Sequence, residues 1–390
     1  MGTATLVVAP QKCGEVDLPV RVRTQTGTLF IKQLFSMPST KESYFIGMDL
    51  HQKTSTFSVK EKEGKIIEAK TISTTKEDVE KFLSPYSGST LTLEPVSQWY
   101  CYADFIESLG LSVKIANPMR VKAIASARIK TDTIDAGVLA DLLRANMLPE
   151  SYHAPANVRA WKEEVRLRMS LVRLRVQVKN KIHALLWKQG IRSPYTLFSK
   201  RGLLWLDTQI FSKEITIALA TYRETLALLD RQVTDAEGRM IEDNKHREEV
   251  KLLITIPGIS YLSALTIMAE VGTISRFPSA KKLMGYAGIV PSTYASGGTV
   301  RHGRITKTGS SWLRWVLIEA AHHQLLCTRQ KGLTKYYNGI KERKGSKAAA
   351  VATARKLCAV IFRVLTDKRP FVSPEEWDNR RAHHRFIAIN

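Results

Sequence analysis

Cysteine is scarce in this chain of 390 residues, and its few copies lie far apart. None of the paired spacings of a zinc ribbon or a disulfide framework occurs among Cys13, Cys101, Cys327 and Cys358. We therefore expect reduced thiols, as in a cytoplasmic protein. The chain also lacks an apolar run of the roughly 20 residues that cross a bilayer, and its N-terminus lacks the pattern of a signal peptide. These absences exclude a disulfide scaffold and argue against a membrane protein.

Acidic residues are the second shortage. Lys and Arg number 59 against 36 Asp and Glu, which gives a formal net charge of +23 and a pI near 9.9. Such a balance favours nucleic acid as the partner over an anionic membrane surface. Hydrophobic residues make up 44% of the chain, so it is neither a disordered basic tail nor too polar for two or three domains.

The first 40 residues lack the periodicity of the rest of the chain. Prolines, glycines and threonines interrupt them, so we expect residues 1–40 to be a disordered N-terminal extension, with an ordinary N-terminal hairpin as the alternative. Met37 stands just before the first convincing strand, so the natural domain is expected to start near it, with residues 1–36 as an accessory arm or an upstream start-codon assignment.

Residues 41–150 show an α/β pattern. Strands expected at 44–49, 55–60 and 66–73 are joined by short turns and predict an antiparallel meander. Helices and strands then alternate, with a helix at 76–83, a strand at 91–94, a helix at 98–109, a strand at 112–116, and helices from Pro118 and Thr133. A meander before this alternation is the order of a ribonuclease-H-like fold.

Residues 151–250 are predicted to form a helical coiled-coil region. Apolar residues recur at threes, fours and sevens over 159–189 and again over 215–250. The two helices are expected to pack as an antiparallel hairpin or to dimerise, and a plain helical linker is the alternative. The polar face of the first helix carries cations that we expect to contact a nucleic-acid backbone, namely Arg166, Arg173, Arg175 and Lys179.

The last third is expected to be mainly helical. Over 251–330, a Pro257-Gly258 turn before a helix at 261–271 resembles a helix-hairpin-helix, although such a turn is more often merely structural. A Gly-rich loop at 294–304 then precedes a helix that starts near Ser310. Residues 331–390 form a basic C-terminal region to which no motif can be assigned.

Acidic side chains stand in an order that a metal-dependent nuclease would use. Asp49 and Glu94 end two candidate strands, and Asp132 and Asp135 lie three apart at a helix start, about 5 to 6 Å from each other at the β-carbons. Hard oxygen ligands of this kind hold Mg²⁺ or Mn²⁺ for phosphodiester chemistry. Taken singly, each acid has a plainer role, because Asp132 fits a helix N-cap, Asp135 a first-turn acid and Glu94 a solvated strand end. Taken together they favour a metal site.

Short motifs stand in a recognisable order from residue 44 to about 325. They are IGMDLHQK at 46–53, EPVS at 94–97, KTDTIDA at 130–136, IPGI at 256–259, RFPS at 276–279, GIVPS at 288–292 and SGG at 296–298. The combination closely resembles the IS one-ten family of insertion-sequence transposases, the DEDD type related to the Piv and MooV DNA invertases.

The resemblance implies a RuvC-like domain whose magnesium ligands are Asp49, Glu94, Asp132 and Asp135, a coiled-coil middle, and a C-terminal transposase domain that contributes a serine matched by Ser296. It implies a DNA transposase or recombinase of an insertion sequence, acting on double-stranded element ends and target under a structured non-coding guide RNA encoded by the element. A homo-oligomer is expected.

The chemistry of the serine loop fits this role. Arg301, Arg304 and Lys307 would neutralise a phosphate, and the glycines after Ser296 would let it approach closely. From the residues alone, however, Ser296 is a loop serine without a neighbouring base.

Two other functions stay open on the residues alone. A Holliday-junction resolvase-like nuclease would use the same acids for hydrolysis, and a non-catalytic nucleic-acid-binding protein would use them only as helix caps. In each case we expect a cytoplasmic protein that is nucleoid-associated when bound to DNA.

Overall fold

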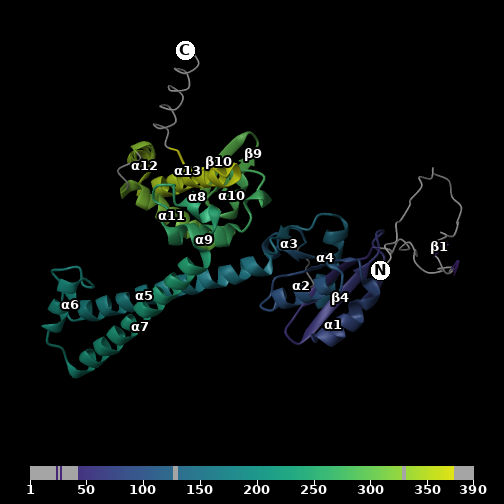
Figure 1. The fold of residues 1–390 in the computed structure, drawn as a ribbon, viewed down its shortest axis with the longest axis horizontal. Helices are drawn as coiled ribbons and strands as arrows, with labels where there is room; N and C mark the ends of the chain where they lie inside the picture. The colour runs from purple at the N-terminus through teal and green to yellow at the C-terminus, as the bar shows by residue number, and fades with distance from the viewer. Residues whose placement is uncertain (1–22, 25–26, 29–42, 126–130, 327–330, 373–390) are drawn as a thin grey trace, which may run out of the picture. The chain divides into compact units, whose positions relative to one another are not determined.

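The computed structural model describes residues 23–24, 27–28, 43–125, 131–326 and 331–372. Two compact units divide the chain, Met1–His153 and Ala154–Asn390, and each is described by itself (Figure 1). The first unit combines a mixed sheet with helices and the second is mainly helical, as the sequence predicts. Among the described helices, none is long and apolar enough to cross a membrane.

The expected N-terminal extension lies almost wholly outside the described residues. Within it, β1 (Arg23–Thr24) and β2 (Gly27–Thr28) pair in an antiparallel manner.

The sheet of the first unit has the strand order β5-β4-β3-β6-β7-β8. An antiparallel meander is formed by β3 (Phe45–Leu50), β4 (Thr54–Lys60) and β5 (Ile66–Ser73). On the other side of β3, β6 (Thr90–Leu93) and β7 (Ser112–Ala116) run parallel to it, and β8 (Glu150–Ser151) closes the edge. The predicted meander and the alternation after it are therefore confirmed, with β8 as an unpredicted addition.

Helices cover both faces of this sheet. They are α1 (Lys76–Leu83), α2 (Trp99–Ser108), α3 (Pro118–Ile124) and α4 (Asp132–Arg144). Because side chains alternate along a strand, Ile46 and Met48 point to one face, where they join the core with Phe82 and Ile106 of α1 and α2. The intervening residues of β3 face α4, which packs on β3 and β4.

An antiparallel helical arm opens the second unit. Its long helices, α5 (Ala156–Lys188) and α7 (Lys213–Asn244), lie side by side and are joined through α6 (Lys200–Asp207) (Figure 1). Ion pairs tie the two helices together, Arg168 with Glu237 and Arg175 with Asp230.

The second long helix is shorter than expected. It ends at Asn244, whose buried side chain donates to the Met240 carbonyl at 2.9 Å and accepts from Arg247 Nε at 2.6 Å. The Arg247 amide then donates to the Asn244 carbonyl at 3.1 Å in a turn, and a separate α8 (Glu248–Leu253) begins after it. The expectation of one helix over 215–250 was wrong at this point.

The remaining helices share one apolar core. Residues of α9 (Tyr261–Val271), α10 (Ala280–Tyr286) and α11 (Ser311–Leu326) meet those of α13 (Ser346–Asp367), and α12 (Lys331–Lys344) packs on α13. Leu357 and Ile361 of α13 are fully buried in that core. The basic C-terminal region therefore begins with two helices, one of which is central to the fold.

The expected Gly-rich loop at 294–304 is a β-hairpin. Its strands are β9 (Pro291–Ser296) and β10 (Thr299–Ile305), and Ser296 pairs with Thr299 across the turn. Gly297 and Gly298 have φ values of 54° and 80°. Two consecutive residues with positive φ make the turn type that matches strand twist, so this glycine pair closes a hairpin rather than opening a loop.

Candidate active site

Gly47 allows α4 to lie directly on β3. A β-carbon at this position would stand 1.9 Å from the Ala136 carbonyl oxygen and 2.7 Å from the Ala140 amide nitrogen. Any larger residue would therefore push the helix off the sheet. Asp49 is two residues further along the strand and shares the face of Gly47. The Gly-x-Asp pattern thus brings a carboxylate to the side of the sheet that α4 covers.

The first turn of α4 carries the next two acids. Thr131 is the N-cap, and its Oγ1 accepts a hydrogen bond from the Ile134 amide at 3.3 Å. Asp132 is therefore not the N-cap that the plainer interpretation required. With capping already satisfied, Asp132 and Asp135 present their carboxylates from the positive end of the helix dipole.

His51 lies between the strand acid and the helix acid. Its Nε2 is 3.2 Å from Asp49 Oδ2 and 3.6 Å from Asp132 Oδ1. One ligand atom from each of these three residues lies within 4.8 Å of the others, a spacing at which a single cation can be held. The sequence reasoning missed His51, although its position two residues after Asp49 in the motif was the available signal.

Burial and like charge act together on Asp49. Its pKa is raised above the ordinary value of 3.8, first because burial removes water from the carboxylate; His51 opposes this rise, and Asp132 and Asp135 add to it. Asp135 is therefore within electrostatic reach of Asp49. A site that crowds carboxylates in this way favours a divalent cation, whose charge would offset the repulsion.

Glu94 reaches the same edge through the sheet. In the parallel ladder Met48 pairs with Leu93, so Asp49 and Glu94 are the next residues on adjacent strands. The carboxyl ends of parallel strands meet at one edge of a sheet. The structure therefore brings Asp49, Asp132 and Asp135 within electrostatic reach of one another, and it places the Glu94 backbone beside that of Asp49 at the end of the neighbouring strand.

Ser296 belongs to the second unit and stands beside the hairpin turn. Residues 293–304 are exposed throughout. Tyr294 and Arg301 pair across the strands, on the face that also carries Ser296. The Ser296 hydroxyl makes no hydrogen bond to any residue in the described ranges. Within these ranges no side chain acts as a base on it, as the sequence alone indicated. Arg304 ends the exposed part of β10, and Lys307 lies just beyond β10 with a φ of 54°.

The start of α11, which follows the hairpin, is fixed by a buried acid. Glu270 of α9 is 1% exposed, and it accepts hydrogen bonds from Ser310 Oγ at 3.0 Å and from Arg166 Nε at 3.0 Å. Ser310 Oγ in turn accepts from the Leu313 amide at the start of α11. The helix after the hairpin is therefore anchored to the core of the unit.

The predicted basic contacts of α5 differ in their surroundings. Arg166 and Arg175 form ion pairs with Glu270 and Asp230. Arg173 is exposed, and Lys179 Nζ lies 5.0 Å from the centroid of the Phe198 ring. Two of these four cations are thus held by structural partners.

Two family models match the chain. A transposase model of the DEDD IS110 type covers residues 46–189, and the model described as the transposase IS116/IS110/IS902 family covers residues 250–338. The first matched segment contains the four acids and the second contains Ser296.

Similar proteins carry related descriptions. The chain is 26% identical to the transposase for insertion sequence element IS1328 of Yersinia enterocolitica, over 84% of this chain and 98% of that protein. It is 25% identical to the transposase for IS1111A of Coxiella burnetii, over 67% and 74% of the two chains. It is also 26% identical to the pilin gene-inverting protein of Moraxella bovis, over 73% and 83%.

Proposed function

Since the chain belongs to the IS116/IS110/IS902 family of transposases, the IS one-ten family of the sequence resemblance, we propose that it cuts and rejoins DNA with a RuvC-like acidic core and a serine nucleophile. The observation that carries this proposal is the convergence of Asp49, Asp132 and Asp135 where Glu94 also ends its strand. The central meander and the strand order support the RuvC-like, that is ribonuclease-H-like, assignment of the first unit.

The acids suit a hard divalent cation, Mg²⁺ or Mn²⁺. All of their donors are carboxylate oxygens, and the pKa of Asp49 is raised first by burial and then by the nearby charges of Asp132 and Asp135, both of which a divalent cation would offset. Asp49, Glu94, Asp132 and Asp135 would hold the cation, which when bound polarises the scissile phosphate. His51 would turn away from Asp132 or serve as a further ligand, because it now occupies the space between two of the acids.

Ser296 is the proposed nucleophile. Its Oγ attacks phosphorus and forms a serine–phosphate ester, while the bond from phosphorus to a sugar oxygen breaks. The serine proton passes to water, and the released sugar oxygen takes up a proton. The ester keeps the strand end attached until the hydroxyl of a second strand attacks the same phosphorus and releases Ser296. Arg301 shares the face of Ser296 and would neutralise the phosphate, together with Arg304 and Lys307 further along the chain.

The partners follow from the same proposal. Double-stranded element ends and target would be the substrates, and a structured guide RNA from the element would choose them, in a homo-oligomer that works on the nucleoid in the cytoplasm. The net charge of +23 supports a polyanionic partner. The name of the Moraxella relative supports rearrangement of defined DNA segments.

Variants of an acid and of the serine test the proposal in one assay. A labelled DNA junction is incubated with protein, Mg²⁺ and element RNA, and the products are resolved under denaturing conditions. We expect Asp135→Asn to abolish cleavage without loss of binding, and Ser296→Ala to abolish the protein–DNA adduct. Glu63→Gln, an exposed acid of the same unit, and Thr299→Ala, the hydroxyl directly opposite Ser296, are the matched controls.

The outcomes separate the competing functions. A Ser296→Ala protein that still cuts would indicate a resolvase-like hydrolase. Cleavage that survives Asp135→Asn would remove the metal site from the mechanism, and a wild-type protein that binds without cutting would indicate a non-catalytic role.

A further inference from the structure

The cations of the helical arm are unevenly neutralised. From Val165 to Leu206 the sequence contains no Asp or Glu, whereas the same stretch holds Arg166, Arg168, Arg173, Arg175, Lys179, Lys181, Lys188, Arg192, Lys200 and Arg201. At the end of the arm near the core, arginines pair with Glu270, Glu237 and Asp230. At the far end, Lys188, Arg192, Lys200 and Arg201 form no ion pair with any residue in the described part of the chain. The structure therefore concentrates unpaired positive charge at the arm tip.

An aromatic column ends at the same tip. The Phe198 ring packs edge-on against His183, with centroids 5.3 Å apart, and His183 lies 5.7 Å from Trp187 at an interplanar angle of 34°. Trp187 is the last ring of the column and is 67% exposed. Its indole is therefore supported from one side and open to solvent on the other.

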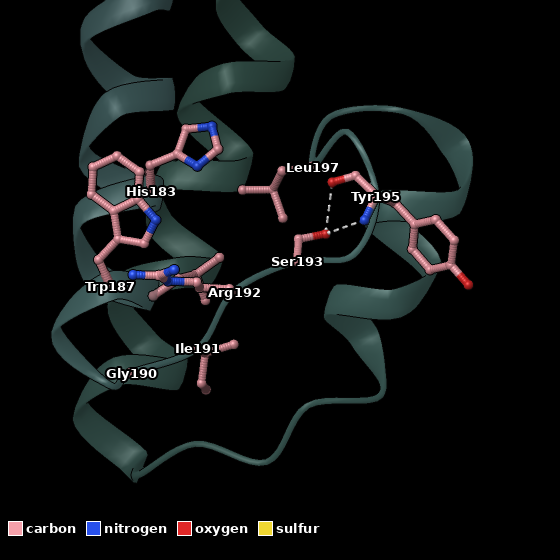
Figure 2. A pocket seen from close by; sticks show the side chains of 9 residues that line it. His183, Trp187, Gly190, Ile191, Arg192, Ser193, Tyr195 and Leu197 are labelled. Atoms are coloured by element: carbon pink, nitrogen blue, oxygen red, sulfur yellow. Dashed lines mark hydrogen bonds between the residues drawn. The ribbon is translucent and has the colours of Figure 1, made fainter.

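The column borders a pocket of about 720 Å³, here named the arm-tip pocket, lined by His183, Leu186, Trp187, Gly190, Ile191, Arg192, Ser193, Tyr195 and Leu197. Figure 2 shows His183 and Trp187 along one helix, with Arg192 next to them and Tyr195 across the pocket. Ser193 Oγ donates to the Tyr195 carbonyl at 2.9 Å and accepts from the Tyr195 amide at 3.1 Å, which shapes the far wall. Tyr195 is itself 47% exposed.

We propose that the arm-tip pocket binds an unpaired stretch of nucleic acid, with a base stacked on Trp187 and the adjoining phosphates held by Lys188 and Arg192. An exposed aromatic ring beside unpaired cations is the combination that single-strand-binding proteins use. A base within a duplex is already stacked on its neighbours, so the pocket selects a single strand. This binding goes beyond the proposed strand transfer and does not require it.

A second copy of the chain is the competing occupant. Leu204 and Ile210 of the α6 region are exposed apolar side chains that a protein partner would cover. Two tips that meet would, however, bring the same unpaired lysines and arginines together, which like-charge repulsion opposes. Charge complementarity therefore favours a polyanion at this end of the arm.

Equilibrium binding to short oligonucleotides tests the stacking. The full-length protein is titrated into fluorescein-labelled dT12, rU12 and a 12-base-pair duplex, and anisotropy is followed at several salt concentrations. Trp187→Ala should weaken single-strand binding by about 5- to 100-fold, whereas Trp187→Phe, which keeps a ring, should stay near wild type. The duplex should bind equally to all three proteins. The ratio of rU12 to dT12 affinity shows whether the strand held is RNA or DNA.

The salt dependence separates stacking from charge. Arg192→Gln should lower the slope of log affinity against log salt by about 0.7, and Trp187→Ala should leave that slope unchanged. Equal losses for Trp187→Ala on duplex and on single strands would overturn the stacking role. Retained affinity of Trp187→Ala for both single strands would overturn it as well.

Photo-crosslinking distinguishes binding at the arm-tip pocket from binding elsewhere on this basic chain. An oligonucleotide with one 5-iodouracil is photo-crosslinked to the protein, and the adduct is mapped by mass spectrometry. We expect the crosslink at Trp187 or Tyr195. Crosslinks only outside residues 183–197 would overturn the proposal. The oligomeric mass of Leu204→Ala and of Trp187→Ala is measured as well. If both variants lose strand binding and both change the oligomeric mass, the proposal is also overturned, because that result assigns the tip to a contact between copies.

Discussion

The close packing of α4 on β3 predicts a large effect from one methyl group. In Gly47→Ala, the added β-carbon would meet the Ala136 carbonyl oxygen at 1.9 Å, and its three nearest obstacles are all backbone atoms. A side chain could rotate away, but a helix backbone must move as a whole. The helix has to withdraw by about 1.5 Å to bring that 1.9 Å to the 3.4 Å at which ordinary contact begins.

That movement acts on stability and on the site together. Overpacking of this kind costs about 1 to 3 kcal/mol, and the backbone obstacle places Gly47→Ala at the upper end. The withdrawal also carries Asp132 away from His51, which is now 3.6 Å from it. We therefore expect a lower free energy of unfolding in urea and, under conditions where the variant is still folded, weaker Mn²⁺ binding by calorimetry.

Gly137→Ala is the matched control. It lies in the same helix, and the nearest atoms to its added β-carbon are the ends of flexible or short side chains at 4.0 Å. Replacing a helix-interior glycine with alanine should stabilise the protein by up to about 1 kcal/mol and leave Mn²⁺ binding intact. A Gly47→Ala protein that unfolds at the same urea concentration as wild type and binds Mn²⁺ equally well would show that α4 does not depend on the absence of a β-carbon at Gly47.

Three further outcomes can be measured independently. The pKa of Asp49 in the folded protein is raised above its ordinary value of 3.8, so between these two pH values the folded protein keeps a proton that the unfolded chain has lost. The free energy of unfolding therefore falls as pH rises from 3.8 through the folded-state pKa. Asp49→Asn should therefore stabilise the metal-free protein at neutral pH, and urea unfolding in EDTA should show that gain shrinking as pH falls toward 3.8; a gain independent of pH contradicts the assignment. Arg166→Ala leaves Glu270 buried beside fewer donors and should lower the free energy of unfolding by about 3 kcal/mol, which a melting temperature equal to wild type would disprove. Arg173→Ala should leave stability unchanged and lower the salt slope of DNA binding by about 0.9, and an unchanged slope would assign this exposed arginine to solvent.

The sheet domain could be predicted because its local and long-range signals agree. The strand at 66–73 and the helix at 76–83 have the bounds that alternation and capping indicated. The acids became interpretable together because each ends a strand or begins a helix, positions that topology brings to one edge. The sequence could not show whether Thr131 or Asp132 is the N-cap of α4, because both residue types cap helices and the two are adjacent; in the structure it is Thr131.

Other features depended on contacts that no sequence window contains. Asn244 lies in the last turn of α7 and is buried although it is polar, and its burial depends on the packing of the second unit. The core position of α13 was not predicted, because its apolar residues Leu357 and Ile361 alternate with solvent-facing lysines and arginines that made the whole region read as basic. The distances of His51 to Asp49 and Asp132 come only from the structure, and the pairing of Arg166 with Glu270 joins residues 104 positions apart.

The exposed hairpin has a consequence for how variation in this protein would be observed. From 293 to 304 no side chain is buried, so substitutions there change the free energy of unfolding very little. A survey that scored cellular abundance would find this segment tolerant, whereas a survey that scored transposition would find it intolerant at Ser296. If Ser296 is the nucleophile that we propose, the difference between the two maps would locate it without reference to any motif, because selection at the hairpin would then come from the bound substrate and not from the fold.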